Sequence, residues 1–398
     1  MSNAILPAVP NAIHQTGGRL TGIGTAVPKH RANRQASAKF ATKISRVSPE
    51  ESRKIQALYR RTGIEQRGSV LLESSAEPDI VNSFYMPAVD IDDRGPGTKL
   101  RNDRYGIEAP VLARQAASRA LQASGLLSEE ITHLITVSCT GFNAPGIDIA
   151  LIDELELPPT TQRIQVGFMG CHAAINGLRA ANGIVAADGN AKVLMCCVEL
   201  CSLHYQYGMA TDHLVSNALF ADGSAVVVLE SEFSAPPPNR HESDCGHPEY
   251  NKPTHNQMVG SVHATGSFLV PKSRDAMTWS IGDHGYQMTL SARVPDLIQA
   301  HLADYLDNFL DQNGESINSI GGWAVHPGGP RILSAVENAL SLAEDSLATT
   351  RSVLSDHGNM SSGTMLFILE RFAKMNQPKP WVMLGFGPGL EIEVALLR

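Results

Sequence analysis

Apolar segments alternate with amphipathic or alanine-rich segments along the first half of the chain. The pattern predicts strands at 19–28, 132–139, 163–169, 192–199 and 225–230. It predicts helices at 49–62, 108–123, 147–154 and about 171–187, the first with a capping box formed by Ser48 and Glu51. Residues 73–107 are rich in Asp, Pro and Gly and are expected to form an irregular loop region. Strands that are apolar throughout indicate sheets buried on both faces, which is typical of layered α/β proteins.

A proline-rich polar segment, residues 231–256, interrupts this alternation. Beyond it the pattern predicts a helix at 295–313, a strand at 321–326, helices from Pro330 and about Asn359, and strands at 381–386 and 391–397. Each part repeats strand, helix and strand with a polar residue on the loop between them. We therefore expect a duplicated fold with an N-terminal half at 1–235 and a C-terminal half at 256–398.

Composition excludes some classes of function. The 398 residues are 43% hydrophobic and carry a formal net charge of -8, so the chain has no overall basic footprint for nucleic acid. The six cysteines are sparse and irregularly spaced, which favours free thiols in a reducing compartment. Neither a signal peptide nor an apolar run long enough for a bilayer is visible. We expect a cytoplasmic protein with no membrane partner.

Cys171 is the first candidate for chemistry. It lies in GFMGCHAAINGLRAA, a glycine-flanked turn where an apolar strand is followed by an alanine-rich helix. Such a turn exposes a side chain, and the free N–H groups and dipole of the helix favour a thiolate. A small cysteine packed under the helix is an equal explanation from this context alone.

His326 and Asn359 occupy similar places. His326 ends the strand GGWAVH and is followed by PGGP, and Asn359 lies in the glycine turn DHGNMSSGT. A packed core histidine and a helix N-cap are the structural alternatives. Together with Cys171 they form a Cys–His–Asn set, which supports acyl transfer through a thioester with hydrogen bonds to an oxyanion. Papain-like proteases use the same residue types, so these alone do not decide the reaction.

The ordered motifs resemble one known family, the type III polyketide synthases (the chalcone and stilbene synthase superfamily). The motifs are YRRTGIEQR, CTGFNAPG, GFMGCHAAINGLRAA, ALFADGSA, WAVHPGGPRIL, LSDHGNMSSGTMLFIL and GFGPGL, spread over nearly the whole chain. The resemblance implies the thiolase-like, duplicated αβαβα fold and a homodimer. It implies acyl-CoA and malonyl-CoA as substrates, with no metal or redox cofactor.

The resemblance also implies roles for single residues. Cys171 would carry the starter and the growing chain, while His326 and Asn359 would promote decarboxylation and stabilise the enolate. Phe220, Met288, Cys139 and His204 fall on substrate-lining positions, and Lys54, Arg61 and Gly328 fall on coenzyme A positions. The product would be a pyrone or resorcinol, with a fatty-acyl starter expected first and an aromatic or malonyl starter second.

Several residues depart from the plant enzymes of the family. Met288 stands in place of a gatekeeper phenylalanine, and Cys139 in place of a cavity threonine. Ala144 replaces a methionine that reaches the partner subunit's site, and Ala57 replaces one of the coenzyme A-binding basic residues. Trp279 falls near a cavity glycine. These changes indicate a bacterial or fungal type of enzyme and a cavity that differs from that of chalcone synthase.

Other interpretations stay open at this point. A ketoacyl-carrier-protein synthase of the III type shares the fold and the Cys–His–Asn set, but would condense once and take its malonyl unit from a carrier protein. A catalytically silent dimeric scaffold is a further alternative. Cys245, His247 and His241 could bind zinc, although they lack the paired spacing of structural zinc sites.

Overall fold

The computed structural model describes residues 17–75, 80–232 and 258–398. Its centre is a nine-stranded mixed sheet in the order β11-β12-β13-β8-β1-β7-β6-β4-β5. The strands from the first half of the chain are β1 (Gly18–Ala26), β4 (His133–Ser138), β5 (Gln162–Gly167), β6 (Lys192–Leu200) and β7 (Asp222–Ser231). Those from the second half are β8 (Gly260–Leu269), β11 (Gly322–Val325), β12 (Trp381–Gly387) and β13 (Glu391–Leu397). Strand β1 joins the two sets, because it pairs with both β7 and β8.

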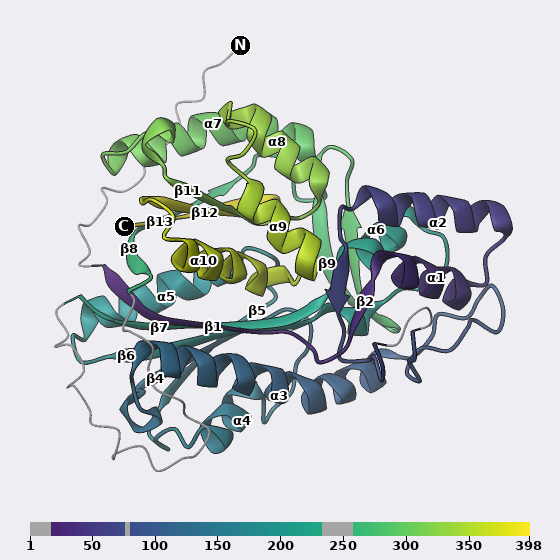
Figure 1. Ribbon diagram of the computed structural model, residues 1–398, viewed down its shortest axis with the longest axis horizontal. Coiled ribbons are helices and arrows are strands. Elements are labelled where there is room, and N and C mark those ends of the chain that lie inside the picture. The colour runs from purple at the N-terminus through teal and green to yellow at the C-terminus, as the bar shows by residue number, and fades with distance from the viewer. Residues whose placement is uncertain (1–16, 76–79, 233–257) are drawn as a thin grey trace.

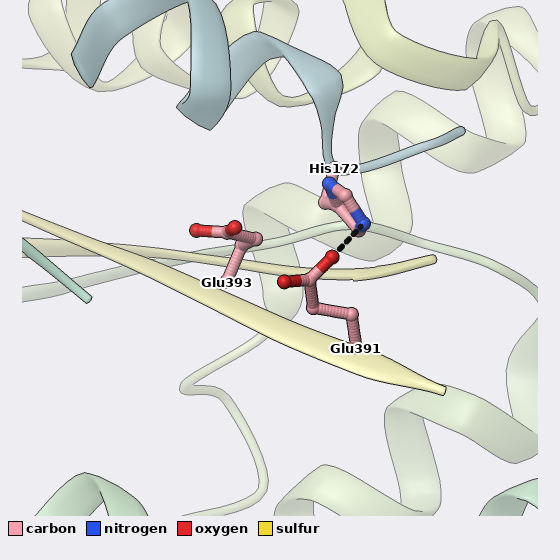
Figure 2. Close-up of side chains that lie close together, drawn as sticks. All are labelled: His172, Glu391 and Glu393. Carbon is pink, nitrogen blue, oxygen red and sulfur yellow. Dashed lines mark ion pairs between the residues drawn. The ribbon is translucent and has the colours of Figure 1, made fainter. Parts of the chain in front are cut away.

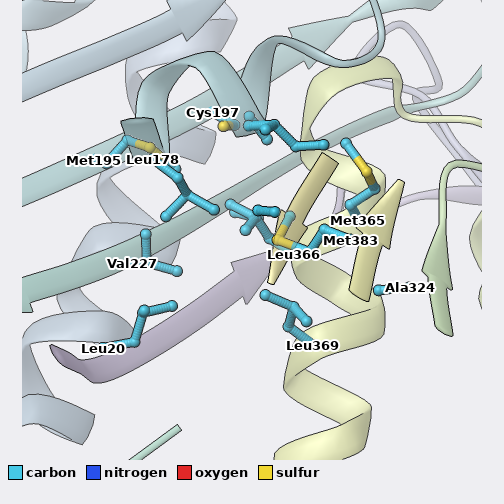
Figure 3. Close-up of a cluster of buried hydrophobic side chains, with 14 of the residues drawn as sticks. Leu20, Leu178, Met195, Cys197, Val227, Ala324, Met365, Leu366, Leu369 and Met383 are labelled. Carbon is cyan, nitrogen blue, oxygen red and sulfur yellow. The ribbon is translucent and has the colours of Figure 1, made fainter. Parts of the chain in front are cut away.

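The two parts of the sheet lie on either side of a central helical layer (Figure 1). This layer contains α5 (Ala173–Ala187) and α10 (Thr364–Met375). Both helices are apolar on the faces that meet the strands, and they share one core with both parts of the sheet. Figure 3 shows this core, with side chains contributed by the elements on both sides: Leu20, Leu178, Val227, Leu366, Leu369 and Met383. Contact with strands on both sides explains why all residues of α10 from Met365 to Leu369 are buried.

Outer helices complete a five-layer α/β arrangement (Figure 1). Helices α3 (Thr98–Ser124) and α4 (Ile147–Glu154) cover the first part of the sheet, and α7 (Val294–Gln312), α8 (Pro330–Leu340) and α9 (Ala348–His357) lie beside the second. Helix α3 crosses β1 closely, because a Cβ atom on Gly22 or Gly24 would lie 2.3 Å from a carbonyl oxygen of the helix. The small residues on both elements, alanines on α3 and glycines on β1, thus allow the helix and the strand to pack closely. The layered α/β class predicted from the alternation is confirmed.

A smaller group of elements caps one end of the layers. It contains β2 (Arg31–Asn33), α1 (Arg34–Ser45), α2 (Pro49–Arg61), β3 (Gln66–Gly68), α6 (Thr211–Leu219), β9 (Met277–Gly282) and β10 (Gly285–Leu290). The predicted capping box of α2 is confirmed, with Ser48 and Glu51 bonded reciprocally. The hairpin β9–β10, helices α1, α6 and α9 and strand β8 were not among the predicted elements. Short 3-10 turns lie at Ser128–Glu130, Cys201–His204, Ile317–Ser319 and Ser361–Gly363.

The prediction of an irregular region up to residue 107 was wrong at its end. Helix α3 begins at Thr98, ten residues before the predicted start, and continues through Gly106 and Pro110. Both residues disfavour helices, but tertiary contacts hold this segment. Arg101 is fully buried and donates hydrogen bonds to the carbonyls of Pro96, Leu203 and Tyr205.

Helix α10 likewise begins at Thr364 and not near Asn359, since a 3-10 turn separates the two. No helix in the described ranges is long and apolar enough to cross a bilayer.

Candidate active site

Cys171 lies on a tight turn between β5 and α5. Phe168 and Gly170 both have left-handed backbones, with φ of 58° and 84°. Gly170 also has no room for a side chain, since a Cβ atom there would lie 2.5 Å from Cδ of Pro388. The motifs GFMGC and GFGPG therefore pack against each other. The predicted turn is present, and the helix begins two residues after the cysteine.

His326 follows β11 and is held by its backbone. Its N–H donates to the carbonyl of Leu384 on β12 at 2.7 Å, and its carbonyl accepts from the N–H of Gly328 at 2.9 Å. The ring is 2% exposed, and neither ring nitrogen has a hydrogen-bond partner within the described residues. Burial, together with the smaller effect of the neighbouring His172, lowers the pKa of His326 to about 3. The ring is therefore neutral and has both nitrogens free for a ligand.

Asn359 is fixed beside Phe220 by backbone bonds. Its N–H donates to the carbonyl of Leu219 at 3.0 Å, and its carbonyl accepts from the N–H of Ala221 at 2.9 Å. Its side-chain Oδ1 accepts from the N–H of Ser361 at 2.9 Å. This bond sets the orientation of the amide and leaves Nδ2 as the group that can donate to a ligand.

These three side chains line one cavity, which we call the catalytic cavity. Its walls also include two substrate-lining positions and one coenzyme A position expected from the sequence. The lining residues are Cys171, Leu219, Phe220, Met277, Met288, Leu290, His326, Gly328, Ile332, Asn359 and Phe386. A thiol, an imidazole and an amide around an otherwise largely apolar space can hold a thioester and stabilise charge on its oxygen.

The thiol of Cys171 contacts a second group of polar side chains. Ser361 Oγ lies 3.6 Å from Cys171 Sγ and 3.4 Å from Cys139 Sγ. Burial raises the pKa of Cys171 to about 12, which the Ser361 contact partly offsets. The thiol is thus neutral, and an attack by its sulfur on a thioester would require a base to take the proton. The neutral ring of His326 lines the same cavity and can accept a proton.

A second cavity adjoins the first behind Cys171. It shares Cys171, Phe220, Met277 and Met288 with the catalytic cavity and adds Cys139, Thr140, Gly170, Cys201, Thr278, Trp279, Ser361 and Pro388. The indole N–H of Trp279 donates to the carbonyl of Cys139 at 2.8 Å, so the ring is fixed in the wall. The structure therefore places Cys139 beside Cys171.

A third space, the aromatic cavity, lies beyond Trp279. It shares Cys201, Phe220 and Trp279 with the second cavity, and Phe40, Tyr59, Tyr85, Tyr205 and Tyr286 are among its other lining residues. The three cavities thus follow one another through shared walls. Phe220 lines all of them.

His204 lines the aromatic cavity and not the catalytic one. Its Nε2 donates to the carbonyl of Thr140 at 2.7 Å, and its Nδ1 accepts from the N–H of Tyr286 at 3.0 Å. Its ring stacks on the Tyr286 ring at a centroid distance of 4.0 Å. Burial lowers the pKa of His204 to about 3. Because both nitrogens are satisfied, the ring is a neutral part of the wall.

The expected coenzyme A residues on α2 are exposed. Lys54 pairs with Glu50 at 2.8 Å, and both side chains are about two-thirds exposed. Arg61 is exposed at the end of the helix, and neither basic residue lines the three cavities. Ala144 lies in an exposed loop. The zinc-ligand candidates Cys245, His247 and His241 lie outside the described residues.

Sequence reasoning missed Glu199, which connects several site residues. Its carboxylate is fully buried and accepts hydrogen bonds from the N–H of Cys139 at 3.0 Å, from Thr140 Oγ1 at 2.8 Å and from Ser362 Oγ at 2.6 Å. Burial raises the pKa of Glu199. A single acidic residue in the apolar strand KVLMCCVEL was the available signal, because a buried carboxylate needs several donors.

Comparison with known proteins agrees with this geometry. The family pattern "Chalcone and stilbene synthases, N-terminal domain" matches residues 11–233, and the corresponding C-terminal domain pattern matches residues 261–398. The chain is 28% identical over 395 residues to the alpha-pyrone synthesis polyketide synthase-like Pks18 of Mycobacterium tuberculosis, covering 98% of this chain and 93% of that protein.

Two solved structures have the same fold. The chain superposes with a TM-score of 0.82 and 28% identity on PKS-I from the brown alga Ectocarpus siliculosus, covering 96% of this chain and 98% of that one. It superposes with a TM-score of 0.83 and 26% identity on the C-terminal type III polyketide synthase domain of Steely1 from Dictyostelium, covering 96% and 99%. The thiolase-like fold expected from the motifs is thereby confirmed.

Proposed function

Because the chain belongs to the chalcone and stilbene synthase family, we propose that it loads an acyl-CoA starter on Cys171 and extends it with malonyl-CoA. The protein is a type III polyketide synthase, a condensing acyltransferase. This family membership argues against the ketoacyl synthase and scaffold alternatives. The observation that carries the residue assignment is that Cys171, His326 and Asn359 line one cavity together with Gly328.

The chemistry divides between the thiol and the two hydrogen-bond donors. In loading, the sulfur of Cys171 attacks the acyl thioester, its proton passes to His326, and coenzyme A leaves with a proton as the free thiol. In extension, the malonyl carboxylate leaves as carbon dioxide and its electron pair forms an enolate. His326 and Asn359 Nδ2 donate to the enolate oxygen. The enolate carbon then attacks the acyl carbonyl and releases the Cys171 thiolate.

A fatty-acyl starter that gives a pyrone or resorcinol product is the proposal that the cavities support best. The second and aromatic cavities continue from Cys171 along walls rich in aromatic, methionine and cysteine side chains. Such walls suit an alkyl chain better than a polar one. The printed name of the Mycobacterium tuberculosis relative refers to alpha-pyrone synthesis, which favours a pyrone. An aromatic or malonyl starter remains the second candidate.

Coenzyme A is proposed to lie between α2 and the mouth of the catalytic cavity. Lys54 and Arg61 are seven residues apart and so share one helical face, where they can contact phosphates. Gly328 lines the cavity and would allow the pantetheine arm to approach the backbone. The two proposed halves, 1–235 and 256–398, then supply the nucleophile and the His–Asn donors respectively.

A homodimer is proposed from an exposed apolar stripe. On α3, Leu100, Ile107 and Val111 are 59%, 64% and 44% exposed and lie on one helical face. Phe142 is 40% exposed and lies next to this helix, since its carbonyl accepts from Asn102 Nδ2 at 2.7 Å. Contiguous exposed apolar side chains mark protein interfaces. Light scattering of the wild type should give the dimer mass, and Ile107→Glu should shift it towards the monomer.

The decisive assay is incubation with labelled malonyl-CoA and a panel of acyl-CoA starters, with mass spectrometry of the products. We expect carbon dioxide release and a pyrone or resorcinol from fatty-acyl starters. Cys171→Ala should abolish extension but keep some malonyl decarboxylation, because His326 and Asn359 remain. If no starter gives a polyketide, the proposed function fails.

A further inference from the structure

His172 follows the nucleophile directly and is held on two sides. Its ring is 1% exposed, and its Nδ1 lies 2.8 Å from Oδ1 of Asn176, one turn along α5. Asn176 Nδ2 in turn donates to Glu393 at 2.9 Å, which fixes the orientation of the amide. Nδ1 of His172 must therefore be the donor to Asn176.

The other ring nitrogen faces a carboxylate. Nε2 of His172 makes no hydrogen bond within the described residues, yet it lies 3.5 Å from Oε2 of Glu391 on β13 (Figure 2). The ring edge and the carboxylate therefore face each other as a His172–Glu391 pair. Glu391 is 27% exposed and connects this pair to solvent.

The ring also connects the two catalytic loops. A Cβ atom on Gly385 would lie 2.8 Å from Cβ of His172, and one on Gly387 would lie 2.1 Å from its Cδ2. Both glycines belong to β12, whose Leu384 carbonyl accepts the backbone N–H of His326. His172 is thus wedged between the turn that carries Cys171 and the strand that holds His326.

A metal site is the alternative for this cluster. His172, Glu391 and Glu393 place their ligand atoms within 4.8 Å of one another. The carboxylate of Glu393 is already occupied, because it accepts hydrogen bonds from Asn176, Ser267 and both terminal nitrogens of Arg179. Only two ligands would remain, fewer than the three or four that protein zinc sites use. The contacts therefore favour a direct His172–Glu391 pair over a metal site.

We propose that His172, held by Asn176 and Glu391, is a positioning residue for the condensing reaction. It clamps the Cys171 turn against β12 and places the His172–Glu391 pair beside His326. This proposal rests on the proposed function, because it assigns a role within that reaction. His326, Glu391 and the adjacent Cys171 are titratable groups near the ring. Glu391 and Glu393 in turn face Tyr305, and Glu393 pairs with Arg179.

The test uses His172→Gln, Glu391→Ala and the conservative Glu391→Gln, with Glu344→Gln at an exposed position as the control. For His172→Gln and Glu391→Ala we expect kcat of chain extension to fall about tenfold or more, since small misplacements of reacting groups are costly. KM for malonyl-CoA should change by less than about twofold, because no hydrogen bond or ion pair within the described residues joins this pair to Lys54, Arg61 or Gly328. Glu391→Gln keeps a hydrogen-bonding partner and should recover most of kcat.

A pH profile separates positioning from a general structural defect. The readout is the single-turnover release of coenzyme A during starter loading, which needs His326 as a neutral base. His172 lowers the pKa of His326, after the larger effect of burial. His172→Gln should therefore shift the acidic limb of this profile to higher pH. A loss of rate by the same factor at every pH, or no loss, would overturn the proposal.

Three further outcomes have distinct meanings. Inactivation of the wild type by a chelator, with recovery on adding Zn²⁺, would show a metal site at His172 and Glu391 and overturn the proposal. A wild-type protein that loads no acyl-CoA starter at all would instead refute the proposed function. An active wild type whose His172→Gln variant has unchanged kcat and pH profile would refute the role of His172 alone.

Discussion

Replacing Asn359 tests how the site stabilises the enolate. The side chain makes two separable contacts: Oδ1 accepts from the N–H of Ser361 at 2.9 Å, and Nδ2 is left to donate to the substrate. Asn359→Ala removes both. The backbone bonds to Leu219 and Ala221 do not involve the side chain, so the loop should stay in place.

The two contacts predict different magnitudes. Leaving the buried N–H of Ser361 without an acceptor should lower the free energy of unfolding by about 1–3 kcal/mol. Removing one donor to an oxyanion should lower the rate by about 10²- to 10³-fold, equivalent to about 2.7–4 kcal/mol in the transition state. Asn359→Asp keeps an oxygen for Ser361 but replaces the donor by a carboxylate oxygen. It should retain more stability than Asn359→Ala and lose at least as much activity.

The assay is conversion of malonyl-CoA to acetyl-CoA in the Cys171→Ala background at pH 8, followed by chromatography. This background removes the acyl carrier, so the rate reports decarboxylation alone. Asn190→Ala, on an exposed turn, is the matched control. Thermal unfolding of the same samples gives the stability difference. If adding Asn359→Ala or Asn359→Asp leaves the decarboxylation rate equal to that of the Cys171→Ala parent, Asn359 does not stabilise the enolate and the reasoning fails.

Three further predictions follow from other parts of the structure. Trp279→Ala removes the ring between the second and aromatic cavities, so mass spectrometry should show longer acyl starters accepted; an unchanged starter profile would contradict a continuous path. Burial raises the pKa of Asp222 from 3.8 to about 6, so the folded state keeps a proton that the unfolded chain releases. The unfolding free energy should therefore fall as pH rises from about 4 to about 6, by up to about 3 kcal/mol, and denaturant titrations of Asp222→Asn should lack this fall. Replacing Lys54 and Arg61 by alanine should raise KM for malonyl-CoA with kcat unchanged, most strongly at low ionic strength; Lys374→Ala is the control, and an unchanged KM would move the phosphate site elsewhere.

The order of apolar and polar positions was enough to predict the layered α/β class and most strands. Local signals did this, because a strand buried on both faces must be apolar along its length. The same signals placed Cys171, His326 and Asn359 at turns after or between regular elements. Local signals failed for α3, because Gly106 and Pro110 disfavour a helix. Hydrogen bonds from the buried Arg101 to distant residues hold this helix in place.

Only the tertiary structure decided how these turns combine. The catalytic cavity joins residues from both halves of the chain, and Asn359 is aligned by backbone bonds to residues 219 and 221, about 140 positions away. His204 became a neutral wall residue because Thr140 and Tyr286 satisfy both its nitrogens. The hydrogen bonds of Glu199 to Cys139, Thr140 and Ser362, and the approach of His172 to Glu391, involve partners that are remote in sequence, so the sequence alone did not indicate them. A pattern of residues reports the local backbone and its burial, whereas hydrogen-bond partners and charge neighbours depend on chain segments that meet only when the layers pack.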